Sequence, residues 1–136
     1  MIDTHIFIHF VNAPSELSEY VYDIMSDPNI KVCMSAESLR ELVVAYNTGN
    51  ISSPRWKSPA DVLSDVVNLA GIEILPITAE VGYRYATLYI NEAQEHYDPS
   101  DHIIICHAMV THLPLISDDH KFLFYEDQGL MLIYDD

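Results

Sequence analysis

The sequence predicts an α/β protein in which helices cover both faces of a central parallel sheet of about five strands, a three-layer α/β/α arrangement. Two observations support this prediction. Short apolar runs alternate with longer helical segments along the chain, and each run is continuously apolar, as in a strand that is buried on both faces. The 136 residues are 49% hydrophobic, which is enough for one domain over residues 1–136 with a full core.

The expected strands are short. The first is a run of three residues that ends at an acid, Asp3, directly before a helical segment. The five expected strands cover residues 1–3, 30–34, 72–76, 112–117 and 129–134.

The expected helices follow these strands, and several begin at residue types that cap helix N-termini. Ser15, Ser35, Thr78 and Asp98 are the N-cap candidates, and Pro99 stands at the first helical position after Asp98. The expected helices cover residues 4–11, 15–25, 35–46, 59–69, 78–95, 98–110 and 118–124.

The helix at 98–110 is apolar around most of its circumference, which is typical of a buried helix. Asp101 lies on the same stripe as Ile105 and Ala108, so it points inward from the N-terminal end of this helix. Two interpretations of Asp101 remain open. It complements the helix dipole and the free N–H groups of the first turn, or it forms a site with other acids.

Three further acids, Asp3, Glu41 and Asp119, follow apolar runs or lie in the helix after one. In parallel α/β folds, sites lie beyond the carboxyl ends of the strands, and these acids share that edge. Carboxylates gathered there repel one another unless protons or a cation are present. Oxygen ligands favour Mg²⁺ or Mn²⁺, which serve phosphodiester hydrolysis, so the pattern indicates a nuclease. Helical periodicity in 35–46 argues otherwise for Glu41, because it places this residue on the solvent side.

The charge balance is strongly acidic. There are 21 Asp and Glu residues against six Lys and Arg, a formal net charge of −15. Nucleic-acid binders usually show a basic footprint, and this chain shows none. Either polyanions are not its partners, or divalent cations and a basic partner chain supply the missing positive charge. A surplus of surface acid that only keeps the protein in solution is the third interpretation.

The segment 50–58 has the composition of a loop and holds Arg55, Trp56 and Lys57. Tryptophan between two basic residues favours stacking on a base and contact with phosphates. The alternative is that the tryptophan anchors the loop to the core. A single tryptophan in a loop favours the anchor interpretation.

The remaining features predict a soluble cytoplasmic protein without a membrane segment. No run approaches the roughly 20 apolar residues that span a bilayer, and the N-terminus lacks the regions of a signal peptide. Cys33 and Cys106 lie in apolar segments, where a free cysteine behaves as a small buried hydrophobe. A disulfide framework is therefore not expected.

Five stretches carry a resemblance to a known family. They are Ile2-Asp-Thr-His-Ile-Phe-Ile8, Met34-Ser-Ala-Glu-Ser-Leu-Arg-Glu-Leu42, Ile74-Leu-Pro-Ile-Thr78, His96-Tyr-Asp-Pro-Ser-Asp-His-Ile-Ile-Ile-Cys-His-Ala108 and Leu115-Ile-Ser-Asp-Asp-His-Lys-Phe122. These stretches resemble those of the PIN domain family and occur in the same order as in that family. The resemblance is to the VapC-type toxin ribonucleases of bacterial toxin–antitoxin modules in particular. The resemblance implies a PIN-like fold and Mg²⁺- or Mn²⁺-dependent cleavage of RNA.

The resemblance also implies roles for particular residues. The four catalytic and metal-binding acids are Asp3, Glu41, Asp101 and Asp119, and the accessory residues are Thr4, Ser117 and Asp118. Ser100 and His102 stand where the family commonly has an aromatic residue and an arginine. The weaker candidates for substrate binding are Arg55, Trp56, Lys57 and His102. The implied partners are RNA, a small antitoxin with a basic segment, and a second copy of the chain in a homodimer.

Two other functions are alternatives to a nuclease. A PIN-like interaction module that binds a basic partner without catalysis is suggested by the negative charge and by His102. A phospho-acceptor domain needs an aspartate at the end of its third strand and a lysine after its fifth. Here the third strand leads into Leu75-Pro76-Ile77-Thr78 and the fifth into Tyr134-Asp135-Asp136, which disfavours that reading.

Overall fold

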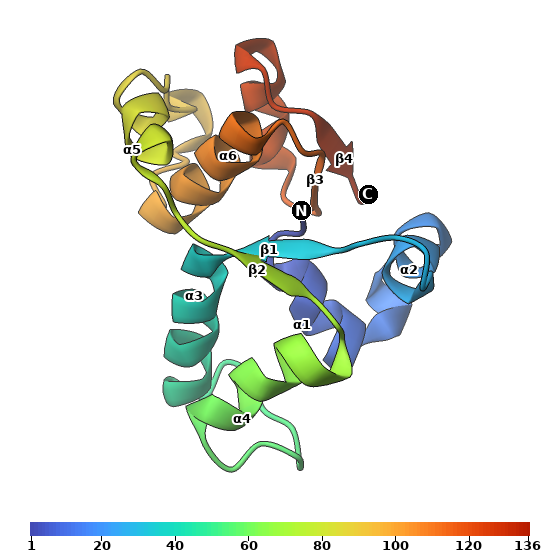
Figure 1. Cartoon of the computed structure of the whole chain (residues 1–136). Coiled ribbons are helices and arrows are strands. Elements are labelled where there is room, and N and C mark those ends of the chain that lie inside the picture. The colour runs from blue at the N-terminus through green and yellow to red at the C-terminus, as the bar shows by residue number, and fades with distance from the viewer.

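A twisted parallel sheet lies in the middle of the molecule, with helices on both of its faces (Figure 1). This computed structural model describes all 136 residues. Four strands are formed: β1 (Cys33–Ser35), β2 (Glu73–Leu75), β3 (Leu115–Ser117) and β4 (Leu132–Tyr134). β1 pairs in parallel with β2, and β3 pairs in parallel with β4.

Ile2 joins the two strand pairs into one sheet. It forms parallel bridges to Met34 of β1 and to Ile116 of β3, so the order across the sheet is β2, β1, Ile2, β3, β4. The expected parallel α/β fold is confirmed. A single bridging residue takes the place of the expected first strand, because Asp3 already caps the following helix and the chain leaves the sheet there.

Six α-helices and four 3₁₀ or π segments connect and cover the strands. The α-helices are α1 (Thr4–Asn12), α2 (Glu19–Ser26), α3 (Ala36–Asn47), α4 (Pro59–Ser64), α5 (Ala79–Ala86) and α6 (Pro99–Thr111). Three 3₁₀ segments, η1 (Pro14–Glu16), η3 (Glu92–Gln94) and η4 (His120–Gln128), and one π segment, η2 (Asp65–Leu69), complete the chain. No helix has the length and apolar character needed to cross a membrane.

The helix starts that depend on local capping are largely as expected. The Ser35 hydroxyl accepts a hydrogen bond from the N–H of Glu37 at the start of α3, and Asp98 caps α6 with Pro99 at its first position. The predicted start of α2 was wrong by several residues, because Ser18 and not Ser15 is its N-cap. Pro14 begins a separate 3₁₀ turn, η1, which takes up the residues expected in the first turn of α2.

Two later helices also differ from expectation. α5 ends at Ala86 instead of continuing to Glu95, and the chain then forms the short turn η3, in which the Asn91 side chain accepts from the N–H of Gln94. The expected helix at 118–124 is the 3₁₀ segment η4, which Asp119 caps. Both changes matter for the site, because they place the chain between α5 and α6 against η4.

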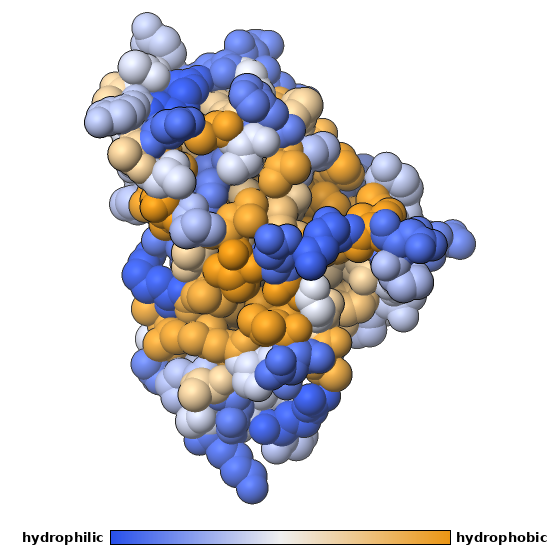
Figure 2. All heavy atoms as spheres, in the orientation of Figure 1, coloured by the Kyte–Doolittle hydropathy of each residue, from blue (hydrophilic) through white to orange (hydrophobic).

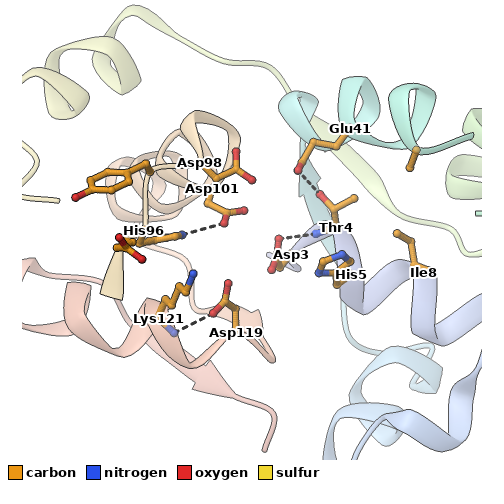
Figure 3. Close-up of a pocket in the computed structure, with 13 residues that line it drawn as sticks. Asp3, Thr4, His5, Ile8, Glu41, His96, Asp98, Asp101, Asp119 and Lys121 are labelled. Atoms are coloured by element: carbon orange, nitrogen blue, oxygen red, sulfur yellow. Dashed lines mark hydrogen bonds and ion pairs between the residues drawn. The ribbon is translucent and has the colours of Figure 1, made fainter. Parts of the chain in front are cut away.

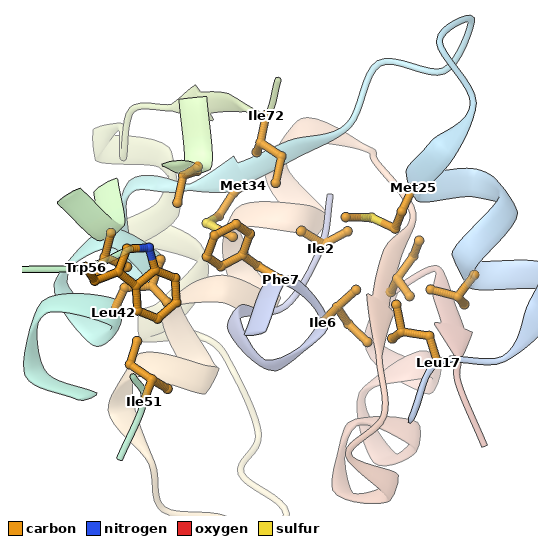
Figure 4. Close-up of a cluster of buried hydrophobic side chains, with 14 residues drawn as sticks. Ile2, Ile6, Phe7, Leu17, Met25, Met34, Leu42, Ile51, Trp56 and Ile72 are labelled. Atoms are coloured by element: carbon orange, nitrogen blue, oxygen red, sulfur yellow. The ribbon is translucent and has the colours of Figure 1, made fainter. Parts of the chain in front are cut away.

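The core lies on both faces of the sheet. Met34 and Ile116 point to the face covered by α1 to α4, where they pack with Phe7 (Figure 4). Their neighbours Cys33 and Leu115 point to the opposite face, which α6 and η4 cover. This alternation is why the strands read as continuous apolar runs in the sequence.

The two edges of the sheet differ in character. Apolar side chains form a band across the face shown in Figure 2, and part of it is a groove beside the N-terminus that Met1, Val32, Cys33 and Leu113 help to line. These residues precede or begin the strands. The opposite edge, where the strands end, carries the acids.

Candidate metal centre

A cleft of about 340 Å³ opens at the carboxyl edge of the sheet (Figure 3). Its walls come from the start of α1, from α3, from the loop before α6, from α6 itself and from η4. The residues that line it are Asp3, Thr4, His5, Ile8, Glu41, Ala45, Glu95, His96, Tyr97, Asp98, Asp101, Asp119 and Lys121. All four acids expected to form a site lie here, although they are separated by up to 116 positions in the sequence.

Asp3 is the most constrained of these acids. It lies between the bridging residue Ile2 and α1 and is only 4% exposed. One carboxylate oxygen accepts from the backbone N–H of Thr4 at 2.7 Å, and the other accepts from the Ser117 hydroxyl at 2.9 Å. Its own N–H donates to the carbonyl of Ile116 at 2.9 Å. Asp3 therefore serves both as the N-cap of α1 and as the floor of the cleft.

The surroundings of Asp3 disfavour its charge. Burial raises the pKa of Asp3 from 3.8 to about 7, and the nearby charge of Asp101 adds to this rise. The hydrogen bonds from Ser117 and Thr4 and the charge of His5 act in the opposite direction without cancelling it. A buried carboxylate beside a second carboxylate lacks a compensating positive charge, which a bound cation would supply.

Glu41 lies in the cleft wall and not on the solvent side that periodicity predicted. It is half-buried, and its Oε1 accepts from the hydroxyl of Thr4 at 2.6 Å. Burial raises the pKa of Glu41, as do the charges of Asp101 and Asp98, although the Thr4 hydrogen bond lowers it. The helical pattern of α3 missed this contact because α1, which covers that side of α3, is distant in the sequence.

Asp101 stands at the centre of the acids. Asp101 lies in the first turn of α6, where its charge complements the helix dipole, and it also lines the cleft with the other acids. The two interpretations of this residue are therefore compatible. Single ligand atoms of His96, Asp101 and Asp119 lie within 4.8 Å of one another, and so do those of Glu41, Asp98 and Asp101. Because Asp101 belongs to both groups, it is the acid best placed to share a cation with its neighbours.

Asp119, not Asp118, lines the cleft. Its Oδ1 accepts from the N–H of Lys121 at 2.9 Å, and its own N–H donates to Ser117 at 3.1 Å. Asp118 turns toward His9, with 3.6 Å between Oδ2 and Nδ1. Asp118 also has a carboxylate oxygen within 4.8 Å of ligand atoms of Asp3 and His5, so it stands at the rim.

Sequence reasoning did not single out several residues of the cleft, among them His5, His96 and Lys121. His96 precedes α6, so no helical spacing relates it to Asp101. A positive charge beside the cleft was also missed. Arg40 of α3 is held by Glu37 and Ser100, and it lies near enough to Glu41 and Asp98 to feel their charge.

The expected contact of His102 with substrate needs correction. This side chain is 3% exposed, and its Nε2 donates to the carbonyl oxygen of His96 at 2.8 Å. Burial lowers the pKa of His102, which favours the neutral ring. His102 therefore holds the loop before α6 through the carbonyl of His96, and its ring has no exposed surface that RNA could contact.

The expected stacking on Trp56 needs the same correction. Trp56 is 7% exposed, packs in the core beside α4, and donates from its indole N–H to Asp65 at 2.7 Å. Arg55 pairs with Asp65 at 3.1 Å, and neither it nor Lys57 lines the acidic cleft. A base needs an open aromatic face, so the loop-anchor interpretation fits the structure.

Trp56→Ala should therefore act on stability. We expect a loss of about 3–5 kcal/mol in the free energy of unfolding, as for other buried aromatic truncations, measured by urea denaturation. Tyr83→Ala, at a tyrosine that is 74% exposed, is the matched control and should change stability by less than about 0.5 kcal/mol. Unchanged stability with weakened RNA binding in Trp56→Ala would restore the stacking interpretation.

The donor set of the cleft suits a hard cation. Its acids are Asp3, Glu41, Glu95, Asp98, Asp101 and Asp119, and Lys121 is the single lysine or arginine among the lining residues. Carboxylate oxygens are the ligands that Mg²⁺ and Mn²⁺ prefer. The residues present therefore fit a divalent cation.

Fold and site together define a parallel α/β protein with a carboxylate-lined cleft at the carboxyl edge of its sheet. Residues 1–126 match the PIN domain family, and the chain belongs to that family. No protein among those with curated descriptions matches the chain.

Solved structures with the same fold come from VapBC systems. A chain of the VapBC2 structure from Rickettsia felis, bound to a DNA fragment from their promoter, is 20% identical with a TM-score of 0.72, over 100% of this chain and 98% of that one. VapBC-1 from nontypeable Haemophilus influenzae is 20% identical with a TM-score of 0.65, over 98% and 96%. VapBC-5 from Mycobacterium tuberculosis is 20% identical with a TM-score of 0.61, over 98% and 94%. At this identity the likeness establishes the fold.

Proposed function

We propose that the chain is a metal-dependent endoribonuclease, the toxin of a type II toxin–antitoxin pair, that hydrolyses RNA phosphodiester bonds at its four-acid site. The observation that carries this proposal is the convergence of Asp3, Glu41, Asp101 and Asp119 on one cleft. Burial, together with the nearby charge of Asp101, raises the pKa of Asp3, which is consistent with a site that a cation would neutralise. Membership of the PIN family supports the nuclease reading.

The side chains of the cleft have different proposed roles. Asp3 and Asp101 would hold Mg²⁺ or Mn²⁺, with Glu41 and Asp119 completing the site. A bound divalent cation supplies the positive charge that activates water and stabilises the charge developing on the phosphodiester. Thr4 and Ser117 orient Glu41 and Asp3 through their hydroxyls. Lys121, which lines the same cleft, attracts a phosphate of the RNA.

The partners follow from charge and from the related structures. A net charge of −15 leaves the chain without a basic footprint, so we propose that a small antitoxin inserts a basic segment into the acidic cleft. The fold shared with chains of VapBC structures supports an antitoxin partner. A homodimer in the cytoplasm completes the proposal.

Metal removal tests the activity. The purified chain, free of antitoxin, should cleave tRNA or mRNA with Mn²⁺ or Mg²⁺, lose cleavage in EDTA, and regain it when excess Mn²⁺ is added. Without a cation, the carboxylates of the cleft repel the phosphodiester and no water is activated. Gel analysis of 5′-labelled RNA measures the cleavage. Cleavage that persists in EDTA would contradict the proposal and point to a contaminating nuclease.

The acidity of the chain also favours a second candidate, a PIN-fold interaction module that binds a basic partner without catalysis. The two candidates differ in calorimetry. The nuclease should bind Mn²⁺ at the acidic cleft, whereas the module should bind a basic peptide tightly and show no Mn²⁺ binding.

A further inference from the structure

His96 is a buried residue in the wall of the cleft and joins one of its acids to the core. It is 2% exposed, yet both ring nitrogens have partners. Nε2 lies 2.9 Å from Oδ2 of Asp101, and Nδ1 lies 2.9 Å from the hydroxyl of Tyr125 (Figure 3 shows the first contact). The ring therefore connects a candidate metal ligand in α6 with a buried tyrosine in η4.

The partners of the ring favour one tautomer of His96, because the Asp101 carboxylate only accepts hydrogen bonds and takes its hydrogen from Nε2. The Tyr125 oxygen already accepts from the backbone N–H of Asn91 at 3.1 Å, and the phenol has one proton to donate. Nδ1 of His96 is the acceptor within its reach. With Nδ1 accepting, the neutral ring carries its proton on Nε2 and donates it to Asp101. In this arrangement the N–H of Asn91, the hydroxyl of Tyr125, both ring nitrogens of His96 and one oxygen of Asp101 are paired.

The ring has little freedom to turn. Its centroid lies 5.0 Å from that of His102, 5.4 Å from Phe122 and 5.5 Å from Tyr125. The backbone of His96 is fixed as well, because its N–H donates to the carbonyl of Asn91 at 3.0 Å and its carbonyl accepts from His102 at 2.8 Å. Packing and hydrogen bonds thus hold the Nε2–H in one direction.

We propose that His96 is a positioning residue for Asp101. It holds one carboxylate oxygen, and the structure gives Asp101 no second side-chain hydrogen bond, so the other oxygen stays free for a cation in the cleft. Groups that orient a metal ligand in this way reduce the freedom that the ligand loses when the ion binds. The inference rests on the proposed function in one respect, that Asp101 is a metal ligand.

Two substitutions at His96 separate positioning from packing. The side-chain amide nitrogen of His96→Gln reaches the place of Nε2 and keeps a donor for Asp101, whereas His96→Asn reaches only the place of Nδ1. Mn²⁺ affinity is measured without RNA, by electron paramagnetic resonance of the free ion, and thermal melting checks that each variant folds. We expect about 10–100-fold weaker Mn²⁺ binding in His96→Asn and a loss within about threefold in His96→Gln.

Tyr125→Phe supplies a second test that leaves His96 in place. It removes the hydrogen bond that holds Nδ1, so the ring is fixed less firmly against Asp101, and Mn²⁺ binding should weaken. Wild-type affinity in both His96→Asn and Tyr125→Phe would overturn the inference, and so would an equal loss in His96→Gln and His96→Asn. Wild-type protein that binds Mn²⁺ without cleaving RNA would overturn the proposed function alone, because the His96 variants are judged on Mn²⁺ binding.

Discussion

Asp101→Asn should reduce metal-dependent RNA cleavage by more than about 100-fold, since losing a group that merely orients a ligand already costs about 10–100-fold. The amide is close in size to the carboxylate, and its oxygen still accepts from His96. The fold should therefore survive while the charge that binds the cation is lost. Cleavage rates with Mn²⁺, together with calorimetric Mn²⁺ titration, measure the effect.

Asp127→Asn is the matched control. Asp127 is exposed in η4, lies outside the cleft, and undergoes the same chemical change. Its cleavage rate should equal that of the wild type. Equal rates for Asp101→Asn and Asp127→Asn would show that Asp101 is not a ligand and would remove the centre of the proposed site.

Asp3→Asn should stabilise the metal-free protein at high pH. The folded state holds the Asp3 proton up to a pKa of about 7, whereas the unfolded chain releases it near 3.8. The resulting contribution to stability is complete below pH 3.8 and is lost as the pH rises to about 7. Above that pH, the ionised carboxylate costs on the order of 4 kcal/mol. Asn cannot ionise, and it retains an oxygen that can cap α1.

Melting temperatures in EDTA between pH 5 and pH 8.5 measure this effect. The wild type and Asp127→Asn should lose stability toward pH 8.5, while Asp3→Asn should lose less. Added Mn²⁺ should recover stability in the wild type at high pH and leave Asp3→Asn nearly unchanged. Parallel pH profiles for Asp3→Asn and the wild type would mean that the Asp3 carboxylate is not destabilised in the folded protein.

The start of α6 shows what could be predicted from the sequence. Asp98 caps it and Pro99 opens it, because both act within a single turn and need no distant partner. The apolar runs likewise predicted parallel strands covered on both faces, since that burial depends on the run itself. Even the edge that carries Asp3 and Asp119 followed from where these runs end.

Residues that depend on distant contacts were predicted less well. Glu41 faces the cleft because Thr4 of α1 binds it, which the periodicity of α3 cannot report. Trp56 packs in the core beside α4, and its indole N–H donates to Asp65, although its basic neighbours suggested an RNA contact. His96 had no sequence signal, because its partner Tyr125 is 29 positions away.

The amino-acid sequence by itself determined the parallel α/β fold, most helix starts and the edge of the sheet that carries Asp3 and Asp119, since each depends on residue types within a few positions of one another. The tertiary structure alone decided which of the polar residues share the cleft and which are buried supports. It did so because burial and charge interaction depend on distances in space: Asp101 acts on the pKa of Asp3 from nearly a hundred positions along the chain, and His96 reaches Asp101 only after the loop before α6 packs on η4.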